Sequence, residues 1–159
     1  PLRSVMSQVL NDLSDPITQS SAEIIMPRKL PVVSGDSTLL FQIFVSLIDN
    51  ALKYRRPRVR PKVTMSYERD GEHVLVRVAD NGVGIPADCH EKVFDIFQRL
   101  HSQDQVPGTG IGLAIMRKAV RALEGQVWLE STVGKGTTFY VKLPLESGKG
   151  KESNLNRRK

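Results

Sequence analysis

The chain has 159 residues, of which 40% are hydrophobic and 25% charged, and its formal net charge is +6. This length and composition are typical of one globular domain, and no run of about 20 apolar residues indicates a membrane span. The single cysteine, Cys89, excludes an internal disulfide, and no Cys/His spacing offers a structural metal site, so a reducing, cytoplasmic setting is expected. Because the chain begins with Pro1 rather than Met, we expect a piece of a longer protein, either soluble or membrane-anchored.

The first half of the chain predicts helices around one short strand. Apolar residues at helical spacing predict a helix over residues 5–13, which Pro16 interrupts or restarts. Residues 22–26 predict a strand, and the strongest helical pattern begins after Asp36 or Ser37, either of which can be the N-cap. Apolar residues recur there in pairs every four residues, so one broad face of this helix must be buried.

The second half predicts mainly strands. They are expected over residues 63–67, 73–78, 127–130 and 138–143. Asp70-Gly71 between the first two is a common hairpin signal. A helical patch is expected over residues 90–97, and a helix follows Gly112 with Gly125 as its C-cap. Since helices and strands do not alternate as in a doubly wound parallel sheet, we predict a two-layer α/β sandwich.

Basic residues gather in two stretches, residues 53–62 and the tail from Lys149 to Lys159. Such clusters attract nucleic acid, phosphates or an acidic partner, or they are only a solvated loop and a solvated tail. We expect the second explanation and no nucleic-acid partner. The region after Pro144 is polar and without periodicity, so residues 147–159 are expected to be a disordered basic tail.

Polar side chains share one edge of the long helix. Ser46, Asn50 and Tyr54 are spaced by four, and Lys53 lies beside them. The amide oxygen of Asn50 suits Mg²⁺, Lys53 supplies a point charge for phosphate oxygens, and the Tyr54 ring suits a base. Exposed polar residues at a helix end are the alternative interpretation.

A strand runs into Asp80, which is followed by Asn81-Gly82-Val83-Gly84-Ile85-Pro86. An Asn-Gly hairpin is one interpretation, but Gly84 and Pro86 interrupt the strand that a hairpin requires next. A carboxylate followed by glycines suits adenine, because Asp80 can accept a hydrogen bond from the exocyclic amine while Gly82 and Gly84 leave room for the ring. The carbonyl of guanine would be repelled there.

A glycine-rich loop, Gly108-Thr109-Gly110-Ile111-Gly112-Leu113, opens a helix. Backbone N–H groups and the helix dipole favour phosphate at such a place. The dinucleotide fingerprint fails because it needs glycine at Leu113, and the P-loop pattern does not occur. A flexible loop without a ligand remains the alternative. Gly134-Lys135-Gly136-Thr137 by itself indicates an ordinary tight turn between strands.

In this order the segments resemble the N, G1, F, G2 and G3 boxes of the catalytic domain of histidine protein kinases, in the superfamily shared with gyrase, mismatch-repair ATPases and a heat-shock chaperone. The boxes correspond to residues 47–54, 80–85, 93–97, 108–113 and 134–137. Phe97-Gln98-Arg99-Leu100-His101 is similar to kinases of the phytochrome type. The resemblance implies a Bergerat-type α/β fold, with a mixed, largely antiparallel sheet covered on one face by about three helices.

The resemblance also implies a nucleotide site for ATP and Mg²⁺. Asn50 would hold Mg²⁺, Lys53 and the backbone of residues 108–113 would hold phosphates, and Asp80 would select adenine. Residues 94–107 would form a mobile lid, from which Arg99 would reach a phosphate. The implied nucleotide-binding residues are Asn50, Lys53, Tyr54, Asp80, Gly82, Gly84, Ile85, Phe97, Arg99, Gly108, Thr109, Gly110, Ile111, Gly112, Leu113 and Thr137.

The implied activity is transfer of the γ-phosphoryl group of Mg-ATP to a histidine on a separate, upstream helical dimerisation domain, as part of a two-component signalling kinase. The kinase domain would span residues 1–146, with a leading helical segment over 1–21. Its implied partners are that dimerisation domain and a response-regulator receiver domain; the parent would be a homodimer and this fragment a monomer. None of His73, His90 and His101 has the setting of a phosphoacceptor, a histidine before an acidic residue on a helix.

One position departs from the family pattern. Ser46 stands where many family kinases carry asparagine and hydrolysing relatives carry a glutamate that activates water. Serine cannot act as that general base, so transfer to an external nucleophile is favoured over hydrolysis, although Mg²⁺ binding could be weakened. An ATP-hydrolysing or serine-kinase relative and a non-catalytic docking module with a degenerate pocket remain the alternatives.

Overall fold

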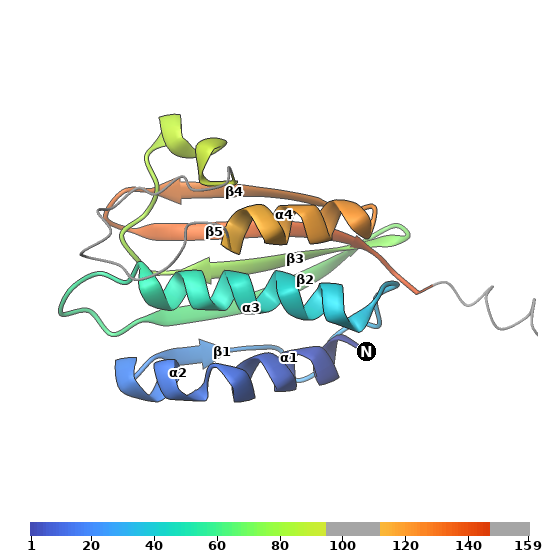
Figure 1. Cartoon of the computed structure of the whole chain (residues 1–159), viewed down its shortest axis with the longest axis horizontal. Coiled ribbons are helices and arrows are strands. Elements are labelled where there is room, and N and C mark those ends of the chain that lie inside the picture. Colours follow the sequence, from blue (N-terminus) through green and yellow to red (C-terminus); the bar gives the residue numbers. More distant parts are fainter. Residues whose placement is uncertain (95–111, 147–159) are drawn as a thin grey trace, which may run out of the picture.

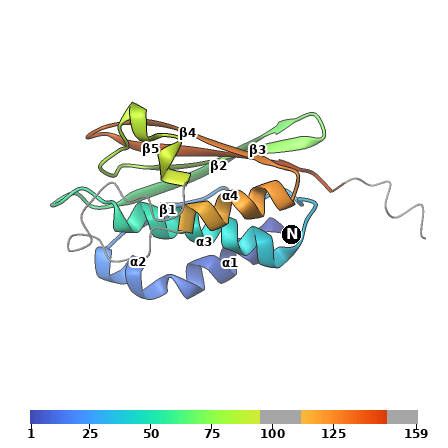
Figure 2. The ribbon, with the colours of Figure 1, turned by 45° about the horizontal axis from the view of Figure 1, so that its top comes forward.

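The computed structural model describes residues 1–94 and 112–146, which form a two-layer α/β sandwich. A five-stranded sheet in the order β1-β2-β3-β5-β4 carries its helices on one face (Figure 1 and Figure 2). The elements are α1 (Leu2–Asp12), α2 (Ser14–Ser20), β1 (Glu23–Ile25), α3 (Ser37–Lys53), β2 (Lys62–Asp70), β3 (His73–Asp80), η1 (Ala87–Cys89), η2 (Lys92–Phe94), α4 (Gly112–Ala122), β4 (Gln126–Thr132) and β5 (Gly136–Pro144). Only β1 and β2 pair in parallel among these strands, so the predicted mixed, largely antiparallel sheet is confirmed.

Alternation of side chains along the strands produces the two faces of the sheet. Successive strand residues point to opposite sides, and in β3 and β5 every second side chain is buried. The buried row includes the cross-strand pairs Val76 with Val141 and Val78 with Phe139. On the opposite face the rings of Trp128 and Tyr140 stack with their centroids 5.5 Å apart. The sheet is therefore apolar toward the helices and polar or aromatic on the other side.

Helix α3 occupies the middle of the helical layer, between α4 and α1. Of the two residues predicted as possible N-caps, Asp36 and Ser37, the cap is Asp36, because its carboxylate accepts a hydrogen bond of 2.7 Å from the backbone N–H of Thr38. The apolar pairs of this helix are buried, and Ile43 and Phe44 are fully inaccessible. This burial holds the polar edge of α3 in one orientation relative to the sheet.

The leading segment forms two helices, with the break at Leu13. Leu2, Met6 and Val9 are fully buried, and α1 packs against α3. Pro16 lies in the first turn of α2, where a missing N–H has no helical partner to lose, so the predicted restart at this proline is confirmed. The segment shares one core with the rest of the described chain.

Two local predictions need correction. Gly125 is not the left-handed residue that ends α4, since Glu124 takes that conformation (φ 59°) and the N–H of Gly125 donates to the Val120 carbonyl at 2.9 Å. A Cβ at position 125 would lie 2.5 Å from the carbonyl oxygen of Lys142, so this glycine serves a close backbone approach instead. Of the helical patch expected over residues 90–97, the described part forms only the short 3-10 turn η2, and a second such turn, η1, lies just before it.

Several predictions fall on residues that the structure does not describe. The basic tail, residues 147–159, and the greater part of the expected lid, residues 95–107, lie outside the described ranges. Within residues 1–94 and 112–146, no helix has both the length and the apolar character that crossing a bilayer requires.

Candidate functional site

Asp80 lies at the end of β3 and is held by backbone donors. Its Oδ1 accepts hydrogen bonds from the N–H of Gly82 at 2.9 Å and from the N–H of Thr137 at 3.2 Å. No hydrogen bond to Oδ2 is found within the described part of the chain. Burial raises the pKa of the Asp80 carboxyl above its usual value, while the two N–H groups act in the opposite direction. The carboxylate thus has one fixed oxygen and one available acceptor.

The loop after Asp80 packs against the end of α3. The N–H of Val83 donates to the carbonyl of Tyr54 at 3.0 Å, and a Cβ at Gly82 would lie 2.5 Å from the same carbonyl oxygen. Gly84 has φ +79°, and a Cβ there would lie 2.3 Å from the Thr132 carbonyl oxygen. The expected reason for these glycines was room for a purine ring. The structure adds a second reason, which is close approach to the protein's own backbone.

The turn between β4 and β5 meets the same loop. The N–H of Gly134 donates to the Val83 carbonyl at 2.8 Å, and a Cβ at Gly136 would lie only 2.0 Å from the Asp80 carbonyl oxygen. Thr137, which follows, is 5% exposed and is buried although it is polar. The sequence indicated an ordinary tight turn. The structure agrees, and it places this turn against the end of β3.

Arg56 is a residue that the sequence did not single out. Its Nε donates to the Asn81 carbonyl at 2.8 Å and its Nη1 to the Gly134 carbonyl at 3.0 Å, so one guanidinium joins both loops. Arg60 likewise donates to the Ser21 carbonyl at 2.6 Å. Part of the basic stretch over residues 53–62 is therefore structural, and no local pattern could have separated these two arginines from their solvated neighbours.

Ser131 in β4 was also missed. Its Oγ lies 2.7 Å from the N–H of Ile85, 2.9 Å from the Gly136 carbonyl and 2.7 Å from Oγ1 of Thr137. The side chain thus contacts both the loop after Asp80 and the turn that carries Thr137. A lone serine in a strand carries no sequence signal for such a role, because it depends on the pairing of β4 with β5 and on Ile85, which lies 46 residues away.

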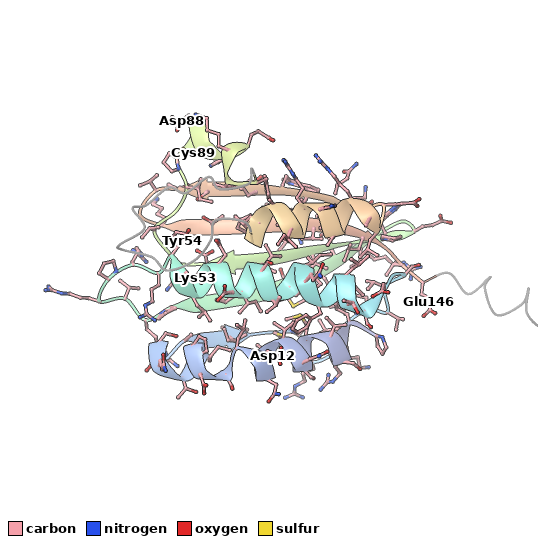
Figure 3. All side chains as sticks on the ribbon, viewed as in Figure 1. Asp12, Lys53, Tyr54, Asp88, Cys89 and Glu146 are labelled. Carbon is pink, nitrogen blue, oxygen red and sulfur yellow. The ribbon has the colours of Figure 1, made fainter. Side chains whose placement is uncertain are left out.

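The polar edge of α3 ends beside these loops. Figure 3 shows Lys53 and Tyr54 at the end of α3. The Nζ of Lys53 lies 2.8 Å from Oδ2 of Asp49, and these side chains are 37% and 34% exposed. Asn50 and Ser46 are half-buried, and the Asn50 amide has no hydrogen-bond partner within residues 1–94 and 112–146. The structure brings Tyr54 to the loop after Asp80, whereas Lys53 pairs on its own helix.

The remaining predicted residues divide into two groups. Those outside the described residues are Phe97, Arg99, Gly108, Thr109, Gly110 and Ile111. Gly112 begins α4, and Leu113 is half-buried against the core. Before the undescribed stretch, the Phe94 ring is buried, with the Phe139 ring edge-on at 6.2 Å and the Arg117 guanidinium 5.2 Å from its centroid. The described start of the expected lid is therefore anchored in the core.

The donor set suits a shared metal site better than a protein cage. Within the described residues, no group of three or more His, Cys, Asp or Glu side chains is placed to hold a metal ion. The Asn50 amide oxygen is a neutral hard donor, of the kind that Mg²⁺ accepts when substrate phosphates and waters complete its shell. The residues present fit Mg²⁺ carried in with a nucleotide.

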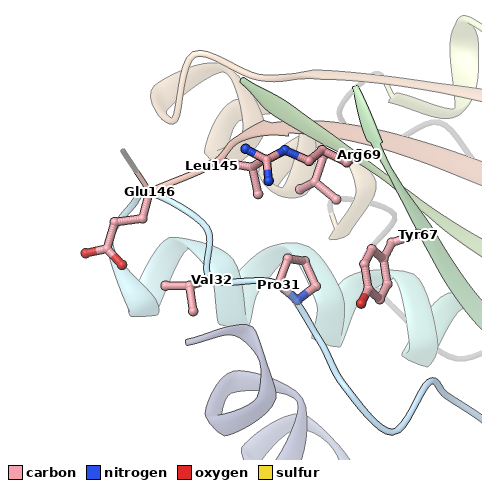
Figure 4. Close-up of a pocket in the computed structure, with 7 residues that line it drawn as sticks. Pro31, Val32, Tyr67, Arg69, Leu145 and Glu146 are labelled. Atoms are coloured by element: carbon pink, nitrogen blue, oxygen red, sulfur yellow. The ribbon is translucent and has the colours of Figure 1, made fainter. Parts of the chain in front are cut away.

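A separate cavity of about 320 Å³ lies at the other end of the sheet, near the start of β3 and the end of β5 (Figure 4). It is lined by Pro31, Val32, Tyr67, Arg69, Val74, Leu145 and Glu146. None of the predicted site residues lines it. The candidate site is therefore the meeting point of Asp80, the two loops and the end of α3.

Comparison with known proteins identifies the family. The profile of the family described as histidine kinase-, DNA gyrase B-, and HSP90-like ATPase matches residues 35–147. This is more than half of the chain, and it contains all five boxes named from the sequence. The chain belongs to this family.

Individual relatives indicate which kind of protein within this family the chain resembles. The chain is 39% identical over 144 residues to the phytochrome-like protein Cph1 of Synechocystis sp., covering 91% of this chain and 19% of that protein. It is 34% identical over 147 residues to the adaptive-response sensory kinase SasA of Crocosphaera subtropica, covering 91% and 38%. The chain spans about a fifth of the length of Cph1 and of cyanobacterial phytochrome A of Nostoc sp., at 19% and 20%.

Solved structures agree with the sequence relatives. The catalytic domain of histidine kinase ThkA superposes with a TM-score of 0.75 at 25% identity, covering 90% of this chain and 91% of that chain. Full-length ShkA in complex with AMPPNP superposes with a TM-score of 0.77 at 26% identity, covering 93% and 31%. The chain is a domain of the histidine kinase type within this family, which confirms the family resemblance seen in the sequence, and the similarity to Cph1 agrees with the phytochrome-like part of it.

Proposed function

We propose that this domain binds Mg-ATP and transfers the γ-phosphoryl group to a histidine on an upstream helical dimerisation domain of the same parent protein. The parent would be a homodimeric two-component kinase in the cytoplasm or facing it, and would pass the phosphoryl group to a response-regulator receiver domain. The domain itself would be monomeric. One observation carries the proposal: Asp80, the two glycine-containing loops and the end of α3 at Tyr54 meet at one place.

The base would bind at Asp80. Oδ2, which accepts no hydrogen bond from the described residues, suits the exocyclic amine of adenine, and burial makes the charged oxygen a strong acceptor because little water competes with it. Gly82, Gly84 and Ile85 would present backbone to the ring, with Thr137 beside the carboxylate and Tyr54 nearby. This arrangement of acceptors favours adenine over guanine.

The phosphates would lie toward α3 and the start of α4. Asn50 would hold Mg²⁺, which when bound offsets the negative charge of the phosphate oxygens. Lys53 would turn from Asp49 to a phosphate, a small rearrangement because an exposed ion pair is weak. The backbone of residues 108–113 and Arg99 would complete this end, as the family resemblance implies.

The nucleophile would come from another domain. His73 lies in β3 and is followed by Val74. His90 is followed by Glu91, but it lies between the 3-10 turns η1 and η2, so neither histidine stands on an α-helix before an acidic residue. Ser46 is no general base for water. The domain would therefore act by positioning the phosphoryl group and neutralising its charge rather than by attacking it.

A single assay tests the proposal. The domain is mixed with γ-labelled ATP, Mg²⁺ and the upstream helical domain of the parent, and the product is treated with acid and with base. Label that is lost in acid and kept in base identifies phosphohistidine. Rapid phosphate release without the partner would favour an ATP-hydrolysing relative, and failure to bind any adenine nucleotide would favour a docking module.

A further inference from the structure

The Ser131 hydroxyl sits among three partners that together decide where its proton lies. Ser131 stands directly opposite Thr137 in the β4–β5 pairing, and their hydroxyl oxygens are 2.7 Å apart. The other partners are the Ile85 N–H at 2.7 Å and the Gly136 carbonyl at 2.9 Å. A hydroxyl has one proton to donate and two lone pairs that accept. Three partners therefore saturate it.

Only one arrangement satisfies all three bonds. The backbone N–H of Ile85 can only donate and the carbonyl of Gly136 can only accept, so Ser131 accepts from the first and gives its proton to the second. Its second lone pair is then left for Thr137. Thr137 must consequently donate its own hydroxyl proton to Ser131. The direction of this bond follows from the two backbone partners.

The result is that Thr137 presents only lone pairs to a ligand. Its hydroxyl proton is engaged by Ser131, and within the described residues its Oγ1 has no other partner. The Thr137 N–H donates to Oδ1 of Asp80 at 3.2 Å, so the residue lies against the carboxylate that would receive the purine amine. Asp80 and Thr137 thus form a pair of acceptors on one side of the proposed base site.

We propose that Ser131 is a positioning residue for purine selection, which fixes the Thr137 hydroxyl as an acceptor. This inference rests on the proposed binding of ATP. A 6-amino purine offers two protons and suits two acceptors, received directly or through a water. A 6-oxo purine turns an acceptor toward both and is disfavoured. Without Ser131 the Thr137 hydroxyl is free to rotate and donate to a 6-oxo group.

The test measures the ratio of the dissociation constants of ITP and ATP, by competition against a fluorescent ATP analogue. In Ser131→Ala the ratio should fall by roughly 3- to 10-fold, the scale of one net hydrogen bond. Ser131→Thr, which keeps the hydroxyl, should restore the ratio. In a Thr137→Val background, which has no hydroxyl to reorient, Ser131→Ala should leave the ratio unchanged.

Distinct results overturn distinct claims. If Ser131→Ala weakens ATP and ITP by the same factor, Ser131 is only structural and the inference is wrong while ATP binding stands. If the unmodified chain binds neither nucleotide, the proposed function fails and the inference falls with it. Should Ser131→Ala not fold, Ser131→Cys replaces it, since a thiol of similar shape is a weak hydrogen-bond partner and should lower the ratio in the same direction.

Discussion

The two ends of the candidate site differ in the groups that form them, with backbone donors prominent at the base end and helix side chains at the α3 edge. At the base end, backbone N–H groups of Gly82 and Thr137 fix Asp80, and the N–H of Val83 is bonded to the end of α3. At the α3 edge, Asn50 and Lys53 are side chains on one helix, and within the described residues Lys53 pairs only with the half-buried Asp49. A carboxylate that backbone N–H groups hold in place can recognise a base of constant shape. Side chains can follow phosphates and a metal that change during the reaction.

The largest effect is expected at the α3 edge. Asn50→Ala should abolish phosphotransfer, because the proposed Mg²⁺ loses its protein oxygen, and should leave the thermal unfolding midpoint nearly unchanged. Asn11→Ala is the matched control, since Asn11 is exposed on α1 and should transfer normally. Transfer by Asn50→Ala at the rate of the unmodified chain would remove Asn50 from the metal site.

At the base end, a substitution that crowds the backbone is expected to lower the stability of the fold. Gly136→Ala puts a Cβ 2.0 Å from the Asp80 carbonyl oxygen and should cost about 3 kcal/mol of unfolding free energy in urea. Gly134→Ala in the same turn also has positive φ (82°) but meets nothing within 4 Å, so about 1 kcal/mol is expected. Equal losses in the two variants would mean that the close approach does not matter.

Asp80→Asn separates recognition from folding at that end. The amide oxygen can keep the bonds from Gly82 and Thr137, while the charged acceptor for the amine is lost. ATP binding, measured by titration calorimetry, should weaken by roughly 1 to 3 kcal/mol. Asp15→Asn on the exposed surface of α2 should leave the affinity unchanged. An unaltered affinity in Asp80→Asn would contradict the assigned role of Asp80.

The unmodified chain and Asp80→Asn should also differ in how their stability depends on pH. Because burial raises the pKa of Asp80, its ionised form costs stability at neutral pH, and this cost disappears as the pH falls through the raised pKa. Asparagine does not titrate. Relative to Asp80→Asn, the unmodified chain should therefore gain unfolding free energy as the pH is lowered from 7 toward the usual carboxyl range. Parallel pH curves from urea unfolding would show that the pKa is not raised.

The smallest effect concerns the ion pair on α3. Both Lys53→Ala and Asp49→Ala remove the pair and should cost about 0.3 to 0.5 kcal/mol of stability, as for other exposed pairs on a helix. Only Lys53→Ala should also weaken ATP binding, and it should weaken ATP more than ADP. Equal nucleotide affinities in the two variants would assign Lys53 to the ion pair alone.

Much of the fold followed from local patterns in the sequence. The paired apolar residues of α3, its Asp36 cap and the alternation in β3 and β5 are properties of short segments, and each was predicted correctly. Strand order and the parallel pairing of β1 were not read from the residues, because they depend on contacts between distant segments.

The candidate site divides in the same way. Asp80 and the glycines were found because a motif is local and its chemistry is visible in the residue types. Ser131 and Arg56 were missed because their partners lie 46 and 78 residues away, at Ile85 and Gly134. Gly125 was misjudged because a glycine after a helix suggests a cap, whereas here the constraint is the backbone of a neighbouring strand.

The burial of α1 has a consequence for the extent of the cooperative unit. The family profile starts at residue 35. Yet α1, which packs against the helix that carries Asn50, has three fully buried side chains, Leu2, Met6 and Val9. Each such side chain stabilises the folded state by about 1.5 to 3 kcal/mol, which is a large share of a typical domain's margin. A fragment trimmed to the profile would expose the apolar stripe of α3 to water and risk aggregation. The region that the family profile matches is therefore shorter than the segment expected to fold as one cooperative unit.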